Sequence, residues 1–347
     1  MTLDLQTLDI QPLDPHHAPE QLLADYHAMR AATVAVDTPK DPPLSYEAAI
    51  GRLRTPPLED GPWRFWVGHL DGRLAGSVGF ALPEGPNSGI VNVEVQVHPE
   101  LRRRGVGTAL LRAVLPAVLE TRRDTVLGFF MNPDSPAARW AGGLGFEVTQ
   151  SMVLQVLPIA STPAQLWDVP VPTGYRLEQW TGVTPEPLID SYAVARQAIE
   201  DAPLGRTSYL PTPWTPARIR ETDRELAAAG TEQLVVVAIE DATDQVVGVH
   251  VIHRPPHRRE LGLIQDTSVP AAHRGHGLGL AMKAAMMRRL TDERPEMERI
   301  LTTTATTNTH MIGINEALGY HAARTVIWSE TATARLAERL TASSTGS

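Results

Sequence analysis

The feature that most limits how this chain can fold is an internal repeat. The stretch "LRRRGVGTALL" at residues 101–111 matches "HRGHGLGLAMK" at 273–283, and both contain the pattern Arg-x-x-Gly-x-Gly at an offset of 172 residues. The same or nearly the same offset joins further pairs: Gly76 and Gly248, Glu94 and Asp266, Val97 and Val269, Gly145 and Gly319, and Phe146 and Tyr320. One glycine motif is a weak signal, but this ordered series predicts two copies of one domain, 1–157 and 174–330.

Two further segments complete the predicted organisation. Residues 158–173, between the copies, contain four prolines. Because proline lacks a backbone N–H and fits neither a helix interior nor a central strand, these residues predict a linker. Residues 331–347 predict a short C-terminal helix followed by a frayed end.

Each copy shows the same order of predicted elements. A helix with apolar residues at helical spacing comes first, then a hairpin, then a strand that leads into the glycine motif and a long helix. A further strand, a short helix and a last strand follow, which predicts an α/β (α+β) fold with helices on a mixed sheet. Pro116 is expected to kink or shorten the long helix of the first copy. Apart from the helices after the glycine motif, the predicted ranges are 19–32, 64–82, 90–97, 125–131 and 146–157 in the first copy, and 185–199, 234–252, 261–269, 299–305 and 320–328 in the second.

Composition excludes several classes of site and partner. The chain has no cysteine, which excludes disulfides, thiolate metal sites and a cysteine nucleophile. The net charge of −9 argues against nucleic-acid binding. The sequence contains no stretch of about 18 apolar residues, so it predicts no membrane span. The N-terminus lacks the basic-then-apolar layout of a signal peptide. We therefore expect a cytoplasmic protein with neither a nucleic-acid nor a membrane partner.

The two glycine motifs predict an anion site. The start of a helix leaves backbone N–H groups unpaired and carries partial positive charge. Glycines ahead of it let the backbone approach a bulky anion, and the neighbouring arginines suit phosphate. The pattern is neither a P-loop nor a dinucleotide-binding fingerprint. The alternative interpretation, a helix start with incidental glycines, is weaker because the motif occurs twice.

These residues carry a resemblance to a known family. The strand, the Arg-x-x-Gly-x-Gly turn, the helix, the next strand and the late "LGF" or "LGY" resemble the GCN5-related N-acetyltransferase (GNAT) superfamily. Two copies in one chain resemble its tandem actinobacterial members, such as mycothiol synthase, and "DTSVPAAHRGHGLGLAMK" with "NTHMIGINEALGY" is especially similar to that group. The resemblance covers nearly the whole chain. It implies two tandem domains, each with a mixed, mostly antiparallel sheet that splays to admit a thioester.

The resemblance also implies the cofactor, acetyl-CoA, and the residues that hold it. The pyrophosphate would lie on the glycine turn and the pantetheine arm along the preceding strand end, as a ligand that adds to the sheet. The implied residues are Val95, Val97, Arg102, Arg103, Arg104, Gly105, Val106, Gly107 and Thr108 in the first copy, and Thr267, Val269, Arg274, Gly275, His276, Gly277, Leu278, Gly279, Asn308 and Asn315 in the second.

The implied reaction is direct acetyl transfer to a small primary amine in a ternary complex. Such a transfer needs a base for the ammonium, and Glu94 and Asp266 lie on the strands that line the thioester in the family. We predict each as base or amine anchor. The alternative is a carboxylate that pairs with a basic neighbour or caps a turn. Backbone N–H groups near Val97 or Val269 would hold the oxyanion.

The sequence departs from the family at the proton donor for the leaving thiolate. Many members carry a tyrosine five residues before the late phenylalanine, whereas this chain has Ala141 and Asn315 there. Neither side chain is an acid, although Asn315 can still form a hydrogen bond to the sulfur or the substrate. This departure keeps a second hypothesis open, a non-catalytic acyl-CoA-binding or sensing protein. A third is a protein or peptide acetyltransferase.

The second copy is the better candidate for activity. Asp134 in the first copy stands where the second has Asn308, and an aspartate is unfavourable beside a polyphosphate. The first copy then binds acetyl-CoA or serves as a scaffold, and the two copies form either an internal pseudo-dimer or part of a homodimer. The cluster His250, His253 and His257 is interpreted as a basic hairpin loop, and no metal is expected.

Overall fold

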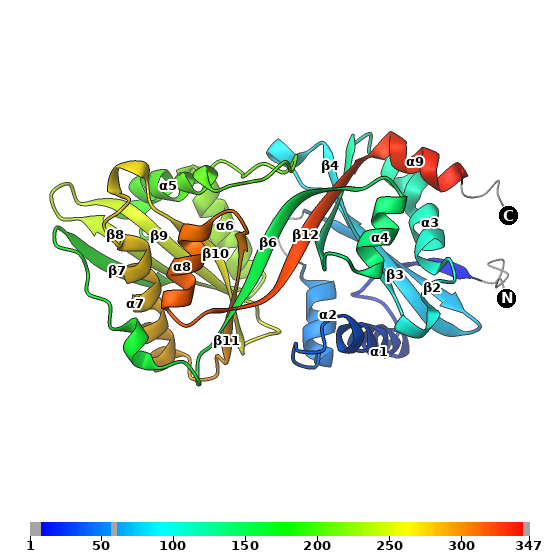
Figure 1. Ribbon diagram of the computed structural model, residues 1–347, viewed down its shortest axis with the longest axis horizontal. Coiled ribbons are helices and arrows are strands. Elements are labelled where there is room, and N and C mark those ends of the chain that lie inside the picture. The colour runs from blue at the N-terminus through cyan, green and yellow to red at the C-terminus, as the bar shows by residue number, and fades with distance from the viewer. Residues whose placement is uncertain (1–7, 57–60, 343–347) are drawn as a thin grey trace. The chain divides into compact units, whose positions relative to one another are not determined.

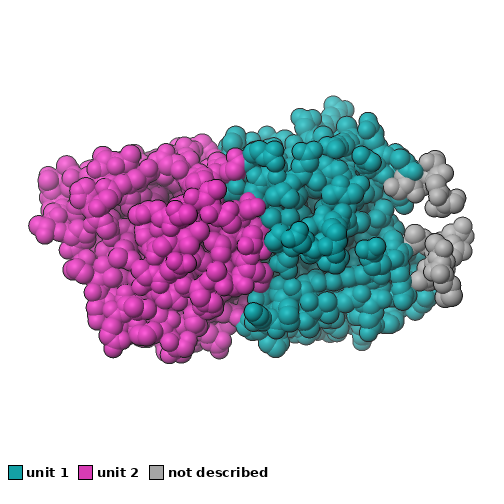
Figure 2. All heavy atoms as spheres, in the orientation of Figure 1, with its two compact units in different colours: residues 1–150, 206–210, 327–347 teal, residues 151–205, 211–326 magenta. Residues whose placement is uncertain are grey.

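The computed structural model describes residues 8–56 and 61–342 and divides into two compact units (Figure 2). Unit 1 comprises Met1–Gln150, Arg206–Leu210 and Ile327–Ser347, and unit 2 comprises Ser151–Gly205 and Pro211–Val326. The units cut the chain at other places than the predicted copies. Residues 158–173 are part of unit 2, and the helix of the predicted tail belongs to unit 1. The predicted fraying at 343–347 lies outside the described residues.

Unit 1 is a mixed sheet with helices on both faces (Figure 1). All neighbouring strands pair antiparallel except β4 and β5, which pair parallel. The strand order is β1 (Asp9–Leu13), β2 (Trp63–Leu70), β3 (Arg73–Ala81), β4 (Ile90–Val97), β5 (Thr125–Met131) and β12 (His321–Ala332). The helices are α1 (Glu20–Asp37), α2 (Tyr46–Arg54), α3 (Val106–Glu120), α4 (Pro136–Gly143) and α9 (Thr333–Ala342).

Unit 2 repeats this plan. The pairing is again antiparallel except between β10 and β11. The strand order is β7 (Tyr175–Thr181), β8 (Glu232–Glu240), β9 (Gln245–Arg254), β10 (Leu261–Ser268), β11 (Arg299–Ala305) and β6 (Glu147–Pro158). The helices are α5 (Ile189–Gln197), α6 (Pro216–Ala228), α7 (Leu278–Glu293) and α8 (Thr309–Ala317). The predicted fold class, a mixed and mostly antiparallel sheet flanked by helices, is confirmed in both units.

Each unit takes its last strand from the other sequence copy. In unit 1, Ile327–Ala332 of β12 pairs with Thr125–Met131 of β5. In unit 2, residues 152–158 of β6 pair with Arg299–Ala305 of β11. The sequence predicted the last strand of each copy close to its observed residues. It did not predict that this strand pairs with a strand of the other copy. Because the two copies have the same strand pattern, the last strand of each can pair equally well in either sheet. A local pattern therefore cannot distinguish a strand that joins the sheet of its own copy from one that is exchanged.

Two other expectations are corrected by the packing. Pro116 does not shorten α3, which continues to Glu120. The loss of one backbone hydrogen bond is tolerated there because the flanking Val114 and Val118 are buried in the core. The predicted linker is not a free connection either. Its Trp167 is 2% exposed, and the indole N–H donates a hydrogen bond of 3.1 Å to the carbonyl of Leu318.

Both sheets separate where the parallel strands end. β4 and β5 pair only from Ile90–Val93, although β4 continues to Val97. β10 and β11 pair only from Leu261–Leu263, and β10 continues past a bulge to Ser268. Unpaired backbone groups of the inner strands therefore face an opening in each unit, at the place where the splay was predicted.

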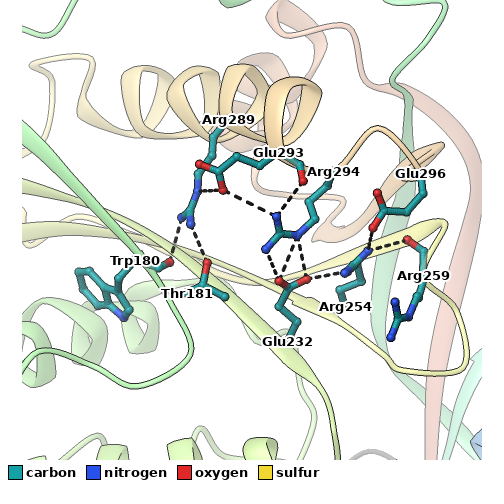
Figure 3. A network of polar contacts seen from close by, with 9 residues as sticks. All are labelled: Trp180, Thr181, Glu232, Arg254, Arg259, Arg289, Glu293, Arg294 and Glu296. Atoms are coloured by element: carbon teal, nitrogen blue, oxygen red, sulfur yellow. Dashed lines mark hydrogen bonds and ion pairs between the residues drawn. The ribbon is translucent and has the colours of Figure 1, made fainter.

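An ion-pair network fastens the C-terminal end of α7 to the sheet of unit 2 (Figure 3). The carboxylate of Glu232, on β8, pairs with Arg294 and with Arg254 of β9. Burial raises the pKa of Glu232, but the two guanidinium groups outweigh it and lower the pKa. Arg289 donates hydrogen bonds to Trp180 and Thr181 at the end of β7. These contacts fix the helix whose other end carries the glycine turn.

Candidate active site

The glycine motif lies at a helix start in both units. Gly105 and Gly277 are the N-cap residues of α3 and α7, with φ angles of 84° and 81°. This left-handed conformation is easy only for glycine. It turns the chain from the strand end into the helix and exposes the first-turn N–H groups, which form the cradle that an anion would occupy. The predicted juxtaposition of strand end, glycine turn and helix start is confirmed.

The cradle of unit 2 is open. At Gly275 and Gly277 an added Cβ would meet no atom within 4 Å. The residue of unit 1 that corresponds to Gly275 is Arg103, which adopts a φ of 63° at a steric cost of about 1–2 kcal/mol. Arg103 and Arg104 are exposed and have no ion-pair partner among the described residues. Unit 1 therefore offers more charge at the turn, and unit 2 more space.

A tryptophan packs beside the first turn of α3 in unit 1. The indole N–H of Trp140, on α4, donates a hydrogen bond of 3.0 Å to the hydroxyl of Thr108 in the first turn of α3. A Cβ added at Gly107 would lie 3.6 Å from the same ring. Ile314 holds the corresponding position in unit 2, 3.8 Å from a Cβ added at Gly279. The smaller side chain leaves the first turn of α7 less covered.

The first arginine of each motif holds the turn through contacts to the preceding strand end and to an aspartate. Nε of Arg102 donates to the carbonyl of Val97 at 3.2 Å, and its two terminal nitrogens bind Asp37 at 2.6 and 2.8 Å. Arg274 repeats this in unit 2, with Nε 2.9 Å from the carbonyl of Val269 and an ion pair to Asp201. Both arginines were predicted as phosphate ligands. In this structure Arg102 connects the strand end to Asp37 at the C-terminal end of α1, and Arg274 connects it to Asp201 in the segment that follows α5.

Both predicted catalytic carboxylates are paired with an arginine, which is buried in unit 2 and half-buried in unit 1. Asp266 accepts a hydrogen bond of 2.6 Å from Nε of Arg196, on α5. Glu94 pairs in the same way with Arg30, on α1. The arrangement matches the alternative considered above, a carboxylate with a basic neighbour. Each pair lies on the face opposite the long helix, beside the point where the sheet separates.

The electrostatics of Glu94 favour anchoring over proton abstraction. Burial raises the pKa of this carboxyl, but the charges of Arg30 and Arg52 and the hydrogen bonds from Arg30 and Gln96 outweigh it and lower the pKa to about 2. A carboxylate with so low a pKa is ionised at neutral pH and is a weak base. Its guanidinium partner also compensates its charge.

The two predicted asparagines lie in different surroundings. Asn308 is the N-cap of α8, and its side-chain oxygen accepts from the N–H of Met311 at 3.2 Å, which leaves its amide nitrogen available. Asn315 is fully buried and donates a hydrogen bond of 2.8 Å to Gln155 of β6. Its Oδ1 and Nε2 of Gln155 have no partner among the described residues. A buried amide pair with a free donor and a free acceptor is unusual and costs stability.

The side of the sheet that faces α7 carries a buried polar group, His250 of β9, that was not predicted as functional. Nδ1 of His250 lies 2.8 Å from the hydroxyl of Thr267. Burial, with a smaller contribution from Lys283, holds the pKa of His250 well below its usual value. His250 and His253 are thus buried strand residues of β9, which corrects their interpretation as part of a basic loop. Within the described part of the chain, no cluster of three or more metal-ligating side chains occurs.

Sequence reasoning missed the arginines that hold the carboxylates, although a signal was present. Tyr26 and Arg30 recur as Tyr192 and Arg196 at an offset of 166 residues. Both tyrosines are buried beneath their helices. A shared Tyr-x-x-x-Arg places both side chains on one helix face, as the structure shows. Trp140 and Gln155 had no such signal, because each is present in one copy only.

Family models match both units. The model described as "Acetyltransferase (GNAT) domain" matches residues 61–148, and "Acetyltransferase (GNAT) family" matches 204–320. A protein named mycothiol acetyltransferase from Salinispora tropica is 31% identical over 317 residues, which is 88% of this chain and 92% of that protein. The protein of the same name from Nocardia farcinica is 27% identical, over 76% of this chain and 80% of its own.

Solved structures show the same fold. A tandem GNAT protein from the clavulanic acid biosynthesis pathway superposes with a TM-score of 0.76 at 24% identity, over 94% of this chain and 98% of its own. A GCN5-related N-acetyltransferase from Sphaerobacter thermophilus gives a TM-score of 0.69 at 16% identity, over 94% and 96% of the two chains. No helix among the described residues is long and apolar enough to cross a membrane. The chain belongs to the GNAT acetyltransferases: it is an acyltransferase of two tandem GNAT domains, related to the mycothiol acetyltransferases.

Proposed function

We propose that this protein transfers the acetyl group of acetyl-CoA to a primary amine of a small molecule, by direct transfer in a ternary complex, and that unit 2 is the active unit. The observation that carries the proposal is the combination in unit 2 of an open glycine cradle at the start of α7, the separated end of β10, and Asp266 at the bulge of that strand. The names of the curated relatives support an acetyl acceptor of low molecular weight.

The residues of unit 2 fit acetyl-CoA. The N–H groups of Leu278 and Gly279, in the first turn of α7, suit its pyrophosphate, and a Cβ added at Gly275 or Gly277 would meet no atom within 4 Å. The unpaired strand end at Thr267 offers backbone hydrogen bonds to an extended arm. When bound, acetyl-CoA supplies an acetyl group that is already activated as a thioester.

Asp266 would act on the acceptor amine, and Asn315 would act on the thioester. Arg196 occupies Oδ2 of Asp266, and Oδ1 has no partner among the described residues, so it can accept a hydrogen bond from the amine. Arg196 compensates the charge of Asp266. The carboxylate would therefore orient the amine through a hydrogen bond more than it would attract it by its charge. Asn315 provides a buried amide where other family members carry an acid, so the thiolate would leave without a side-chain proton donor.

A matched pair of variants tests which unit binds the cofactor. Gly279→Glu places a carboxylate in the first turn of α7, and Gly107→Glu does the same in α3. Calorimetric titration with acetyl-CoA should lose the tighter site in Gly279→Glu and keep it in Gly107→Glu. The proposal for unit 2 fails if only Gly107→Glu loses binding.

Turnover decides between the proposed function and its alternatives. Release of CoA across a panel of small amines supports the proposal, whereas binding of acetyl-CoA without release supports an acyl-CoA sensor. Activity on lysine peptides alone would indicate a protein acetyltransferase. We also propose a cytoplasmic location and a monomer that forms its own pseudo-dimer, which light scattering can check against a homodimer.

A further inference from the structure

We infer that the hydroxyl of Thr267 donates a hydrogen bond to the sulfur that leaves during acetyl transfer in unit 2, and that His250 is the positioning residue that orients this hydroxyl. The inference rests on the proposed function and assigns a donor to the leaving group, for which Asn315 offers no acid. The family resemblance implies only a backbone role for Thr267 and no role for His250.

Thr267 lies at the end of β10 that borders the opening in the sheet. On one side its backbone pairs with His250 of β9. On the other side β11 pairs with β10 only at Leu261–Leu263, so it does not reach Thr267. The side chain of Thr267 is half-buried. It therefore stands where the sheet separates.

Thr267 and Asp266 belong to opposite faces of the sheet, as neighbouring strand residues do. Asp266 pairs with an arginine of α5. Thr267 contacts His250, which faces α7, because Val249 and Val251 on either side of it pack in the core with α5. The glycine cradle also belongs to α7. Thr267 therefore lies on the cofactor side of the strand end, and Asp266 on the side where the acceptor would bind.

The hydrogen bonds of His250 leave the hydroxyl proton of Thr267 free. Nδ1 lies 2.8 Å from Oγ1 of Thr267, and Nε2 has no partner among the described residues. Burial and, less strongly, Lys283 hold the pKa of His250 well below its usual value, against a hydrogen bond to the backbone of Asp266 that raises it. A hydrogen bond that raises this pKa is donated by the ring to a carbonyl, so the proton of the neutral ring is on Nδ1.

The hydroxyl of Thr267 thus has a fixed orientation. Its oxygen accepts from Nδ1–H of His250, and its own proton has no acceptor within residues 8–56 and 61–342. Acetyl transfer forms a C–N bond and breaks the C–S bond, whose electron pair stays on the sulfur, while the amine proton passes to solvent. A donor held in place before the reaction stabilises this negative charge. The hydroxyl keeps its proton, and the thiolate later takes one from solvent.

Unit 1 lacks this pair of polar residues. At the offset of 172 residues, Val78 corresponds to His250 and Val95 to Thr267, and the two valines pair in the same register. Two valines therefore fit this place in the fold. His250 is 0% exposed, and a ring nitrogen buried without a partner costs stability. A costly polar pair found only in the unit proposed as active indicates a function there.

The thiol of bound CoA tests the hydrogen bond without turnover. Stabilisation of the thiolate lowers the pKa of the thiol. Carbon NMR titration of CoA labelled next to the sulfur should give a pKa at least about one pH unit lower with Thr267 than with Thr267→Val. Each protein also carries Gly107→Glu, which is designed to keep CoA out of unit 1.

Two conservative variants separate the hydrogen bond from packing. Thr267→Ser keeps the hydroxyl and should keep the low pKa of the thiol. His250→Asn keeps an N–H donor near the place of Nδ1 and should largely keep it too, whereas His250→Val should raise the pKa as Thr267→Val does. If serine and valine at position 267 gave the same pKa of the thiol, the inference would be overturned.

Turnover with the best amine of the panel gives a second readout. Thr267→Val should lower kcat about 10- to 100-fold and leave the Kd of acetyl-CoA unchanged within about twofold. Thr331→Val is the matched control, because Thr331 is a buried strand threonine of unit 1 whose hydroxyl has no partner among the described residues. It should change neither quantity.

The outcomes distinguish this inference from the proposed function. Release of CoA by the wild type with an equal kcat in Thr267→Val, or an equal pKa of the thiol in both proteins, would overturn the inference alone. If no amine is acetylated, the proposed function fails, and the pKa of the bound thiol still decides whether Thr267 donates to the sulfur. A protein that binds no CoA in unit 2 would refute both.

Discussion

Lys283 is expected to destabilise unit 2 in a way that depends on pH. It is one of only two lysines in the chain and is 1% exposed within the core between α7 and the sheet. Nζ lies 5.3 Å from the ring centroid of Tyr320 and has no hydrogen-bond or ion-pair partner among the described residues. Burial alone lowers the pKa of this amine from 10.5 to about 7. Lysine is almost never buried so completely without a partner.

The magnitude of the penalty follows from this pKa. A fall from 10.5 to about 7 corresponds to on the order of 5 kcal/mol between the folded and the unfolded chain, as an upper estimate. The pKa is lower in the folded state, so between about pH 7 and pH 10.5 the unfolded lysine binds a proton that the folded one does not. This group therefore makes the free energy of unfolding rise with pH by about 1.4 kcal/mol per pH unit in that window. Below about pH 7 Lys283 is protonated in both states, and the full cost of burying its charge lowers the free energy of unfolding.

Lys283→Met tests the argument, because methionine keeps the unbranched shape and carries no charge. The first copy shows that an apolar side chain fits, since the residue corresponding to Lys283 is Leu111, which is buried in the core of unit 1. The variant should be more stable than the wild type at pH 7, and the difference should shrink by about 2–3 kcal/mol by pH 9.

The assay is thermal or urea unfolding of both proteins at pH 6, 7, 8 and 9, followed by hydrogen exchange in α7 to assign the change to unit 2. Lys40→Met is the matched control, because Lys40 is exposed and its removal should change neither stability nor its pH dependence. His250 remains neutral in this range, so it does not interfere. A stability difference that stays constant from pH 6 to 9, or a wild type that is the more stable, would refute the reasoning.

Three further predictions concern other parts of the chain. Trp140→Ala uncovers the first turn of α3, and calorimetry should then show stronger binding of acetyl-CoA by unit 1; an unchanged titration would mean that Trp140 does not block the cradle. Glu232→Gln leaves Arg254 and Arg294 without their shared carboxylate and should lower the free energy of unfolding of unit 2 by about 1–3 kcal/mol, with little effect expected on unit 1. Asn87→Ala removes both hydrogen bonds to Leu210, so hydrogen exchange in Arg206–Leu210 should accelerate, and unchanged protection there would contradict the role of Asn87.

The sequence by itself determined the repeat, the order of the elements and the glycine turns. Gly105 and Gly277 precede apolar helical patterns, and the requirement for a left-handed residue at that turn is local, so it can be read from the residues. The strands on either side also have a local signature in their alternating apolar residues. The positions of Glu94 and Asp266 next to the sheet opening followed from the resemblance to the GNAT superfamily.

Only the tertiary structure decided how these parts combine. The exchange of β6 and β12, the pairing of Asp266 with Arg196, and the cover that Trp140 places on Thr108 all join residues far apart in the chain. Such contacts depend on which of several chemically equivalent partners the packed core brings within reach. Local propensity and hydrophobic period are the same for either choice, so a single sequence carries no signal for them.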